Sequence, residues 1–347
     1  MKKGYNGLHP SSELRLDLIS NNWVIIATGR AKRPETFKKE KRAVKKIAES
    51  KCPFCKIKTQ KTPTLIFVNK KKFPLKLGIP KNWSVIVIPN KYPAFSPYSK
   101  LDERIEGNMY KRMNAVGFHE VVVTRDHNKQ MAVFSIKEIK EVIDVYQKRY
   151  ISLMKEKFVN YISIFHNHGK KAGASISHPH SQIITTPLID SDLKKALLNS
   201  ENYWNIHKKC IYCEMNKWEI KKKERIVFEN EKFLVVCPFA SKAAFQVIIS
   251  PKKHLSYFEL ITEKEKELLA EAFKQALGKL YVALGNPDYN FYLHTSPCDG
   301  KKHNYYHWHW TILPKTSVLA GFEIGTQMEI STIEPEKAAE YLRKQQI

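Results

Sequence analysis

The apolar and polar segments of this chain follow one order twice. Within residues 83–187, the apolar runs WSVIVIP and GFHEVVV precede a helical pattern, and NYISIF and SQIITTP follow it. Within residues 232–314, KFLVV and QVIIS precede a second helical pattern, and YNFYL and HWTILP follow it. Short apolar runs bounded by turn residues are typical of strands. The repeated order predicts an α+β unit that is used twice.

The two expected helices begin with the same signal. Ser135-Ile-Lys-Glu138 and Thr262-Glu-Lys-Glu265 each fit the S/T-x-x-E capping box, in which a hydroxyl and a carboxylate bond backbone amides at the helix start. Apolar residues then recur at helical spacing. We therefore expect one buried stripe on each helix, formed by Ile136, Ile139, Ile143 and Tyr146 in the first and by Leu268, Leu269, Phe273, Ala276 and Leu280 in the second.

Composition indicates an ordinary globular chain with an excess of positive charge. The 347 residues are 43% hydrophobic and 27% charged, and 59 Lys and Arg against 34 Asp and Glu give a formal net charge of +25. The charge is spread over short runs such as KKEKRAVKK and IKKKER, which are typical of solvated faces, although an anionic substrate or nucleic acid would also suit them. The first residues contain no apolar core of a signal peptide, and no later segment is long enough to span a bilayer, so we expect a cytoplasmic protein.

Cysteines and histidines are also repeated. Each half carries one C-x-x-C pair, one histidine at the end of a strand and one H-x-H motif, and the two histidines are 51 residues apart in the first half and 53 in the second. Two thiolates and two imidazoles suit a closed tetrahedral site, which is typical of structural zinc. A redox dithiol is the alternative for each pair, but we expect neither pair to open a helix, and Cys237 and Cys298 are expected to be small buried apolar residues. The spacing predicts two structural zinc ions per chain, one on Cys52, Cys55, His127 and His178 and one on Cys210, Cys213, His254 and His307.

The segment HPHSQ is where chemistry is expected. In a strand, residues 178, 180 and 182 point to one face, so two imidazoles and a carboxamide share a surface. A polar face on a half-exposed sheet is the simpler interpretation. If His178 binds the metal, however, His180 remains beside Gln182, and the preceding loop NHGKKAGAS offers Ser175 and backbone amides to phosphate oxygens. The motif therefore favours attack of a histidine on phosphorus.

At these residues the chain resembles the histidine-triad superfamily, in particular its galactose-1-phosphate uridylyltransferase branch with ADP-glucose phosphorylase-type adenylyltransferases. The resemblance covers nearly the whole chain, through NNWVIIATGRAKRP, CPFC, IPNKYPAF, GFHEVVV, RDH, residues 167–182 and AGFEIG. It implies two tandem histidine-triad-like repeats, each an antiparallel half-barrel sheet with packed helices. We expect the first repeat, with the catalytic motif, at residues 1–190 and the second, with the hexose loop, at residues 191–347.

The resemblance also implies residue roles. His180 is the nucleophile, with Gln182 and Ser175 beside it in catalysis, and His178 is a zinc ligand together with Cys52, Cys55 and His127. Substrate binding falls on Arg30, Arg33, Asn90, Asn167, Phe322 and Glu323. The last two belong to a loop that family members donate across a homodimer interface.

The implied reaction is transfer of a uridylyl group from UDP-glucose to a hexose 1-phosphate such as galactose 1-phosphate, through a nucleotidyl-His180 intermediate. An ADP-sugar phosphorylase or adenylyltransferase with the same site is the first alternative. A zinc-containing nucleic-acid-binding protein is the second, and it is disfavoured because zinc binding explains neither Gln182 nor Ser175. The partners expected are therefore a nucleotide sugar, a hexose 1-phosphate and a second copy of the chain, without nucleic acid or membrane. The second half has Trp310 and no glutamine after its H-x-H motif, so we expect it to be a scaffold with a zinc site and no active centre.

Overall fold

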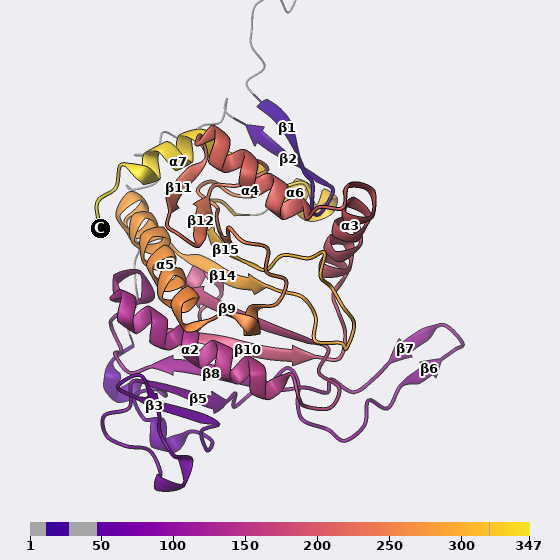
Figure 1. Cartoon of the computed structure of the whole chain (residues 1–347). Coiled ribbons are helices and arrows are strands. Elements are labelled where there is room, and N and C mark those ends of the chain that lie inside the picture. Colours follow the sequence, from indigo (N-terminus) through magenta and orange to yellow (C-terminus); the bar gives the residue numbers. More distant parts are fainter. Residues whose placement is uncertain (1–11, 28–46, 319) are drawn as a thin grey trace, which may run out of the picture.

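The computed structural model describes residues 12–27, 47–318 and 320–347, and its main feature is one long antiparallel sheet (Figure 1). Within the described residues this sheet has 11 strands in the order β11-β12-β13-β15-β14-β9-β10-β8-β5-β3-β4. The strands are β3 (Leu65–Val68), β4 (Lys71–Lys72), β5 (Val85–Pro89), β8 (His119–Thr124), β9 (Tyr161–His168), β10 (His180–Thr186), β11 (Ile226–Glu229), β12 (Phe233–Val236), β13 (Val247–Pro251), β14 (Tyr289–His294) and β15 (His309–Pro314).

The two halves of the sheet have the same connectivity. In the first half, the order β3-β5-β8-β10-β9 is interrupted along the chain by helix α2 (Ile136–Leu153) between β8 and β9. In the second, the order β11-β12-β13-β15-β14 is interrupted by α5 (Glu263–Leu284) between β13 and β14. The halves join where β9 pairs with β14, with Phe291 opposite His166. The expected repetition of strands and helix is therefore present, in a continuous sheet.

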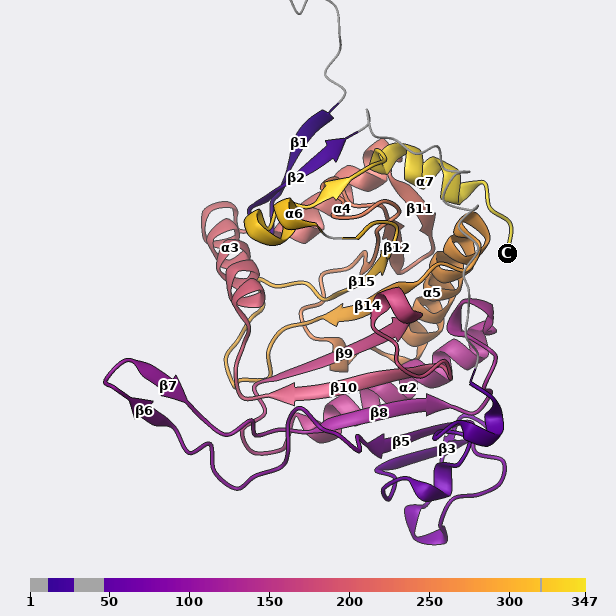
Figure 2. The ribbon, with the colours of Figure 1, turned by 180° about the vertical axis from the view of Figure 1, so that it is seen from behind.

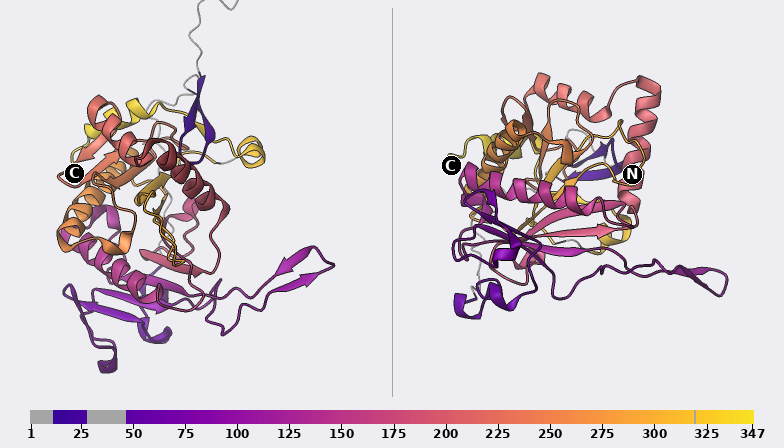
Figure 3. Two further views of the ribbon diagram at one scale, coloured as in Figure 1. Left: turned by 45° about the vertical axis from the view of Figure 1, so that its right-hand side comes forward. Right: turned by 60° about the horizontal axis from the view of Figure 1, so that its bottom comes forward.

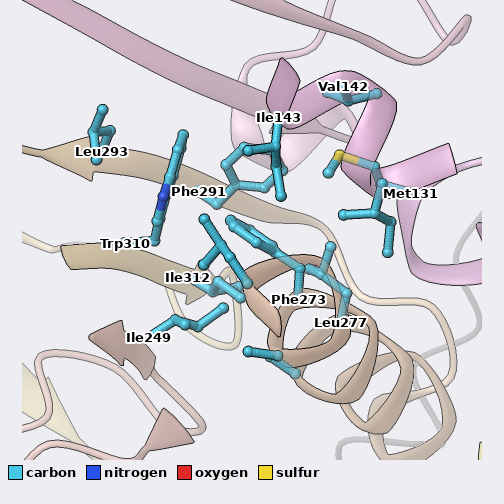
Figure 4. Close-up of a cluster of buried hydrophobic side chains, with 14 of the residues drawn as sticks. Met131, Val142, Ile143, Ile249, Phe273, Leu277, Phe291, Leu293, Trp310 and Ile312 are labelled. Atoms are coloured by element: carbon cyan, nitrogen blue, oxygen red, sulfur yellow. The ribbon is translucent and has the colours of Figure 1, made fainter. Parts of the chain in front are cut away.

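The main core lies between the sheet and the paired helices α2 and α5 (Figure 4). Both capping boxes form as the sequence predicts, at Ser135 and at Thr262. The stripe residues Ile139, Ile143 and Tyr146 of α2 are fully buried, and so are those of α5 from Leu269 onward. The sequence prediction was wrong for Ile136, which is the first residue of α2 and is 42% exposed.

Four further helices and a small sheet lie around the second half of the long sheet, and a hairpin projects from the first half (Figure 2). Helices α3 (Ser191–His207), α4 (Ile211–Lys222), α6 (Gly321–Thr326) and α7 (Pro335–Arg343) accompany a small sheet of β1 (Ser12–Asp17), β2 (Asn22–Ala27) and β16 (Ile330–Ser331). The hairpin of β6 (Arg104–Glu106) and β7 (Tyr110–Arg112) extends away from the body of the protein (Figure 3). None of the helices in the described part of the chain is long and apolar enough to cross a membrane.

The surroundings of the second C-x-x-C pair differ from the sequence prediction. Cys210 is the N-cap residue of α4 and Cys213 lies in its first turn, whereas neither pair was expected to open a helix. The apolar spacing along α4 is weak, since only four of its residues are buried, and this explains why periodicity did not indicate it. The element before α4 is the helix α3, so the strand-then-helix context of a redox dithiol is still lacking.

Candidate active site and metal centres

His180 is the first residue of β10 and lies partly exposed on the face of the sheet opposite α2. The side chain of its neighbour Ser181 points to the α2 side, where its hydroxyl contacts the Tyr146 hydroxyl at 2.5 Å. His180 Nδ1 donates to the His178 carbonyl oxygen at 2.9 Å. A carbonyl oxygen only accepts, so the proton is on Nδ1 and Nε2 has a free lone pair. Burial lowers the pKa of His180 below its ordinary value, which keeps the ring neutral at pH 7.

Gln182 lies two residues further along the same face, as the sequence predicts. Its Oε1 is 2.7 Å from Nε2 of His119, the first residue of the neighbouring strand β8. Asn90 follows β5, and its side-chain nitrogen Nδ2 is 3.1 Å from the same nitrogen, Nε2, of His119. Gln182 and Asn90 are thus brought together, and His119 is the residue between them that sequence reasoning missed. The sequence shows His119 only as a histidine within the apolar run GFHEVVV, and the pairing of β8 with β10 is what brings it into contact with Gln182.

Asn167 and Ser175 precede the HPHSQ segment. Asn167 is in β9, and the register that pairs Ser181 with His166 brings Asn167 opposite His180 when it is continued by one residue. Its Oδ1 accepts from the Asn290 amide at 2.8 Å. Ser175 is exposed in the loop between Gly173 and His178. Arg30 and Arg33 lie outside the described residues.

Phe322 and Glu323 do not lie beside His180 in the same chain. They belong to α6, which lies near β1, β2 and α3, away from the start of β10 (Figures 1 and 2). The Phe322 side chain is exposed, and Glu323 Oε2 accepts from the Ala320 amide at 3.1 Å.

The first predicted metal centre is assembled from the four predicted residues. Cys52 and Cys55 follow a short 3-10 turn, His127 follows β8, and His178 precedes β10. The Nδ1 atoms of His127 and His178 are 3.2 Å apart. Cys55 Sγ lies 3.2 Å from Nδ1 of His127 and 3.6 Å from Nδ1 of His178, and Cys52 Sγ lies 3.6 Å from Nδ1 of His178. These separations are those of ligand atoms around a tetrahedral zinc ion with bonds of about 2.0–2.3 Å.

Hydrogen bonds orient both histidines for this role. His178 Nε2 donates to the Thr124 carbonyl at 2.7 Å, and His127 Nε2 donates to the Ile47 carbonyl at 2.8 Å. Each proton is therefore on Nε2, so both Nδ1 lone pairs point to the common centre, as in known zinc sites. The donor set and its geometry fit zinc.

The second centre repeats the first. Cys213 Sγ is 3.5 Å from Nδ1 of both His254 and His307, and Cys210 Sγ is 4.0 Å from His307 Nδ1. The Nε2 atoms of His254 and His307 donate to the carbonyls of Asn304 and Pro251. Both predicted quartets thus form groups capable of holding a metal ion, with all ligand atoms of each group within 4.8 Å of one another.

The second H-x-H motif has the same internal bond but a closed environment. His309 Nδ1 donates to the His307 carbonyl at 3.2 Å, as His180 does to His178. His309 is buried, its ring stacks on His294 at 4.6 Å, and Tyr212 lies 5.3 Å away. Burial lowers its pKa to about 4. Trp310 and Thr311 stand where the first half has Ser181 and Gln182, so His309 lacks both access and the companions of His180.

Comparisons with known proteins find similarity along nearly the whole chain. The family model "Galactose-1-phosphate uridyl transferase, N-terminal domain" matches residues 8–189, and the corresponding C-terminal domain model matches residues 197–346. ADP-glucose phosphorylase of Arabidopsis thaliana is 33% identical over 338 residues, which cover 96% of this chain and 93% of that protein. Galactose-1-phosphate uridylyltransferase of Thermotoga maritima is 27% identical over 345 residues, covering 96% of this chain and 99% of that protein.

Solved structures give the same result. The crystal structure of the Arabidopsis thaliana ADP-glucose phosphorylase with bound ADP-glucose matches with a TM-score of 0.81 at 30% identity, covering 97% of this chain and 100% of that one. A uridylyltransferase structure matches with a TM-score of 0.72 at 25% identity, covering 95% and 97%. Together with the two family models, these similarities confirm the resemblance found in the sequence. This chain belongs to the galactose-1-phosphate uridyl transferase family.

Proposed function

We propose that this protein transfers a nucleotidyl group from a nucleotide sugar through a covalent intermediate on His180. Nε2 of His180 attacks the α-phosphorus, a P–N bond forms, and the bond from phosphorus to the bridging oxygen breaks, so that the sugar 1-phosphate leaves. A phosphate or sugar phosphate then attacks the same phosphorus and frees His180. The observation that carries this proposal is the hydrogen bond from His180 Nδ1 to the His178 carbonyl, which leaves Nε2 unprotonated.

The neighbouring side chains suit a phosphoryl group in this position. Gln182 and Asn167 lie on the same face as His180, and Ser175 lies in the loop before it. We assign hydrogen bonding of the non-bridging oxygens to Gln182 and Ser175, because donors directed at developing negative charge lower the barrier. Arg30 and Arg33 remain candidates for charge neutralisation, and Asn90 and Asn167 for nucleotide binding.

The similarity figures favour an adenine nucleotide as donor and phosphate as acceptor. The ADP-glucose phosphorylase of Arabidopsis thaliana has a higher identity and a higher TM-score than the uridylyltransferases described above. Phosphorolysis of ADP-glucose would yield ADP and glucose 1-phosphate. Uridylyl transfer from UDP-glucose to galactose 1-phosphate is the second candidate, supported by a uridylyltransferase relative that aligns over 99% of its own length.

Zinc in this scheme is structural. Each quartet supplies four protein ligands, so no coordination position is left for substrate. Zinc would hold the segment around Cys52 and Cys55 against the ends of β8 and β10, and so fix the backbone that His180 contacts. We further propose that the matching strand orders represent two tandem histidine-triad-like half-barrel repeats, divided near residue 190, in a cytoplasmic protein whose thiols stay reduced.

A homodimer would complete the site. Phe322 and Glu323 lie away from His180 in the same chain. Phe322 and Ile324 of α6 are exposed apolar side chains, and so are Leu14 of β1 and Trp23 of β2, the two strands near α6 in Figure 2. Exposed apolar side chains that gather on one part of a protein are typical of an interface. We propose that a second copy covers this surface and receives the α6 segment at its own hexose site.

A substrate panel tests the proposal. The protein is incubated with ADP-glucose or UDP-glucose, each with phosphate or with galactose 1-phosphate, and the nucleotide products are separated by chromatography. We expect ADP from ADP-glucose and phosphate. UDP-galactose from UDP-glucose and galactose 1-phosphate would favour the second candidate, and the absence of any His180-dependent product would contradict both.

A further inference from the structure

His119 connects two segments of the site that lie far apart in the sequence. Its backbone carbonyl accepts from the backbone N–H of Asn90 at 2.8 Å, and its Nδ1 lies 3.1 Å from the backbone nitrogen of Ala94. On its other side, Nε2 lies 2.7 Å from Gln182 Oε1. The ring therefore bridges the loop of residues 90–94 and the strand that carries His180.

These partners fix the proton on the ring. A backbone N–H only donates, so Nδ1 must accept from Ala94. Burial lowers the pKa of His119 below its ordinary value, so the ring is neutral at pH 7 and its single proton is on Nε2. Nε2 is then a donor. The side-chain nitrogen of Asn90, 3.1 Å away, is also a donor, so these two nitrogens form no hydrogen bond with each other.

The proton position in turn fixes the Gln182 amide. A donor at Nε2 of His119 requires the oxygen of Gln182, because the amide nitrogen would present a second donor. With Oε1 held in this way, the Gln182 NH2 group points away from His119. Within the part of the chain that the structure describes, this NH2 group has no hydrogen-bond partner.

We infer that His119 is a positioning residue, which acts through Gln182 by holding its NH2 group ready to donate to a non-bridging phosphate oxygen. This inference rests on the proposed function. Without His119, the Gln182 amide is free to rotate, and half of its orientations present an oxygen to the anionic phosphate. An amide oxygen in that position repels the negative charge that develops in the transition state. Loss of His119 should therefore lower kcat, the rate of the chemical step.

Two amide substitutions separate the two bonds of the ring. His119→Gln keeps an N–H near the position of Nε2, and therefore the bond to Gln182. His119→Asn keeps an acceptor near the position of Nδ1, and therefore only the bond to Ala94. We expect His119→Asn to lower kcat on the order of tenfold with KM nearly unchanged, and His119→Gln to stay within about twofold of the wild type. His207→Gln, at an exposed histidine of α3, is the control.

A double-substitution cycle gives the decisive comparison. In a Gln182→Ala background the NH2 group is gone, so His119→Asn should cost less than about twofold further. Melting temperature and zinc content of each variant check that the fold is retained. Equal losses in His119→Asn and His119→Gln, or a full additional loss in the Gln182→Ala background, would overturn the inference. A wild-type protein without nucleotidyl transfer would instead contradict the proposed function itself.

Discussion

Two histidines with the same local hydrogen bond have different surroundings. His180 and His309 each donate from Nδ1 to the carbonyl two residues before, yet His180 is partly exposed while His309 is buried between His294 and Tyr212. An unprotonated Nε2 is therefore not sufficient for attack. Access from solvent and the neighbouring Gln182 distinguish the two.

This difference predicts opposite effects of substitution. His309→Ala should leave nucleotidyl transfer within about twofold and lower the free energy of unfolding by about 1–3 kcal/mol, because a buried stacked ring is lost. His180→Ala should abolish transfer by several orders of magnitude and leave stability nearly unchanged. Steady-state rates and urea denaturation of both variants measure this, and a large loss of rate in a well-folded His309→Ala would argue for a second active centre.

Sequence patterns were informative at the residue scale wherever the chemistry was local. The C-x-x-C pairs, the strand-end histidines and the two H-x-H motifs indicated both quartets that the structure assembles. They did not indicate His119, or the buried contacts of Ser181 with Tyr146 and His166, because these partners meet only through strand register and helix packing. Contacts of this kind depend on the tertiary fold and have no sequence spacing of their own.

At the scale of elements, the two halves show what periodicity predicts well and poorly. Both capping boxes and most of both helical stripes agree with the structure, because a helix that packs on a sheet has a strong repeat of buried positions. Periodicity did not predict the helices α3 and α4, because few of their residues are buried and the apolar repeat is therefore weak. The hairpin β6–β7 escaped because all six of its strand residues are exposed, so no apolar alternation marks it.

Each group of two cysteines and two histidines brings together residues from different elements, so loss of the proposed zinc should loosen the contacts between these elements. Metal analysis of the wild type should give about two zinc ions per chain, and Cys52→Ser should lower this to about one with a lower melting temperature. The reason is that the segment around Cys52 would lose its link to β8 and β10. Cys298→Ser, at a cysteine outside both quartets, is the control. A wild type without zinc after expression in metal-replete medium would contradict the assignment of both centres.

At the scale of the whole molecule, the fold places the start of β10 and the helix α6 apart. His180 starts a central strand, while Phe322 and Glu323 lie on α6 beside the small sheet (Figure 2). If both act in one site, two chains must contribute to it.

Mixing two inactive variants tests this arrangement. His180→Gly and Glu323→Ala homodimers, exchanged under mild denaturation and returned to buffer, should regain a fraction of wild-type transfer, because some mixed dimers contain one intact composite site. Subunit exchange is verified by mass-tagged chains. Verified exchange without any recovered activity would show that each site is built from one chain.

The central claim is that His180 carries the nucleotidyl group, and covalent labelling tests it most directly. The protein is incubated with ADP-glucose, and in parallel with UDP-glucose, without any acceptor, and is then digested at neutral to basic pH because a phosphorus–nitrogen bond to histidine is acid-labile. Mass spectrometry should find a nucleotidyl adduct on the peptide that contains His180, and it should disappear when phosphate or galactose 1-phosphate is added. An adduct on His309, or an active protein in which His180 never becomes labelled, would contradict the account.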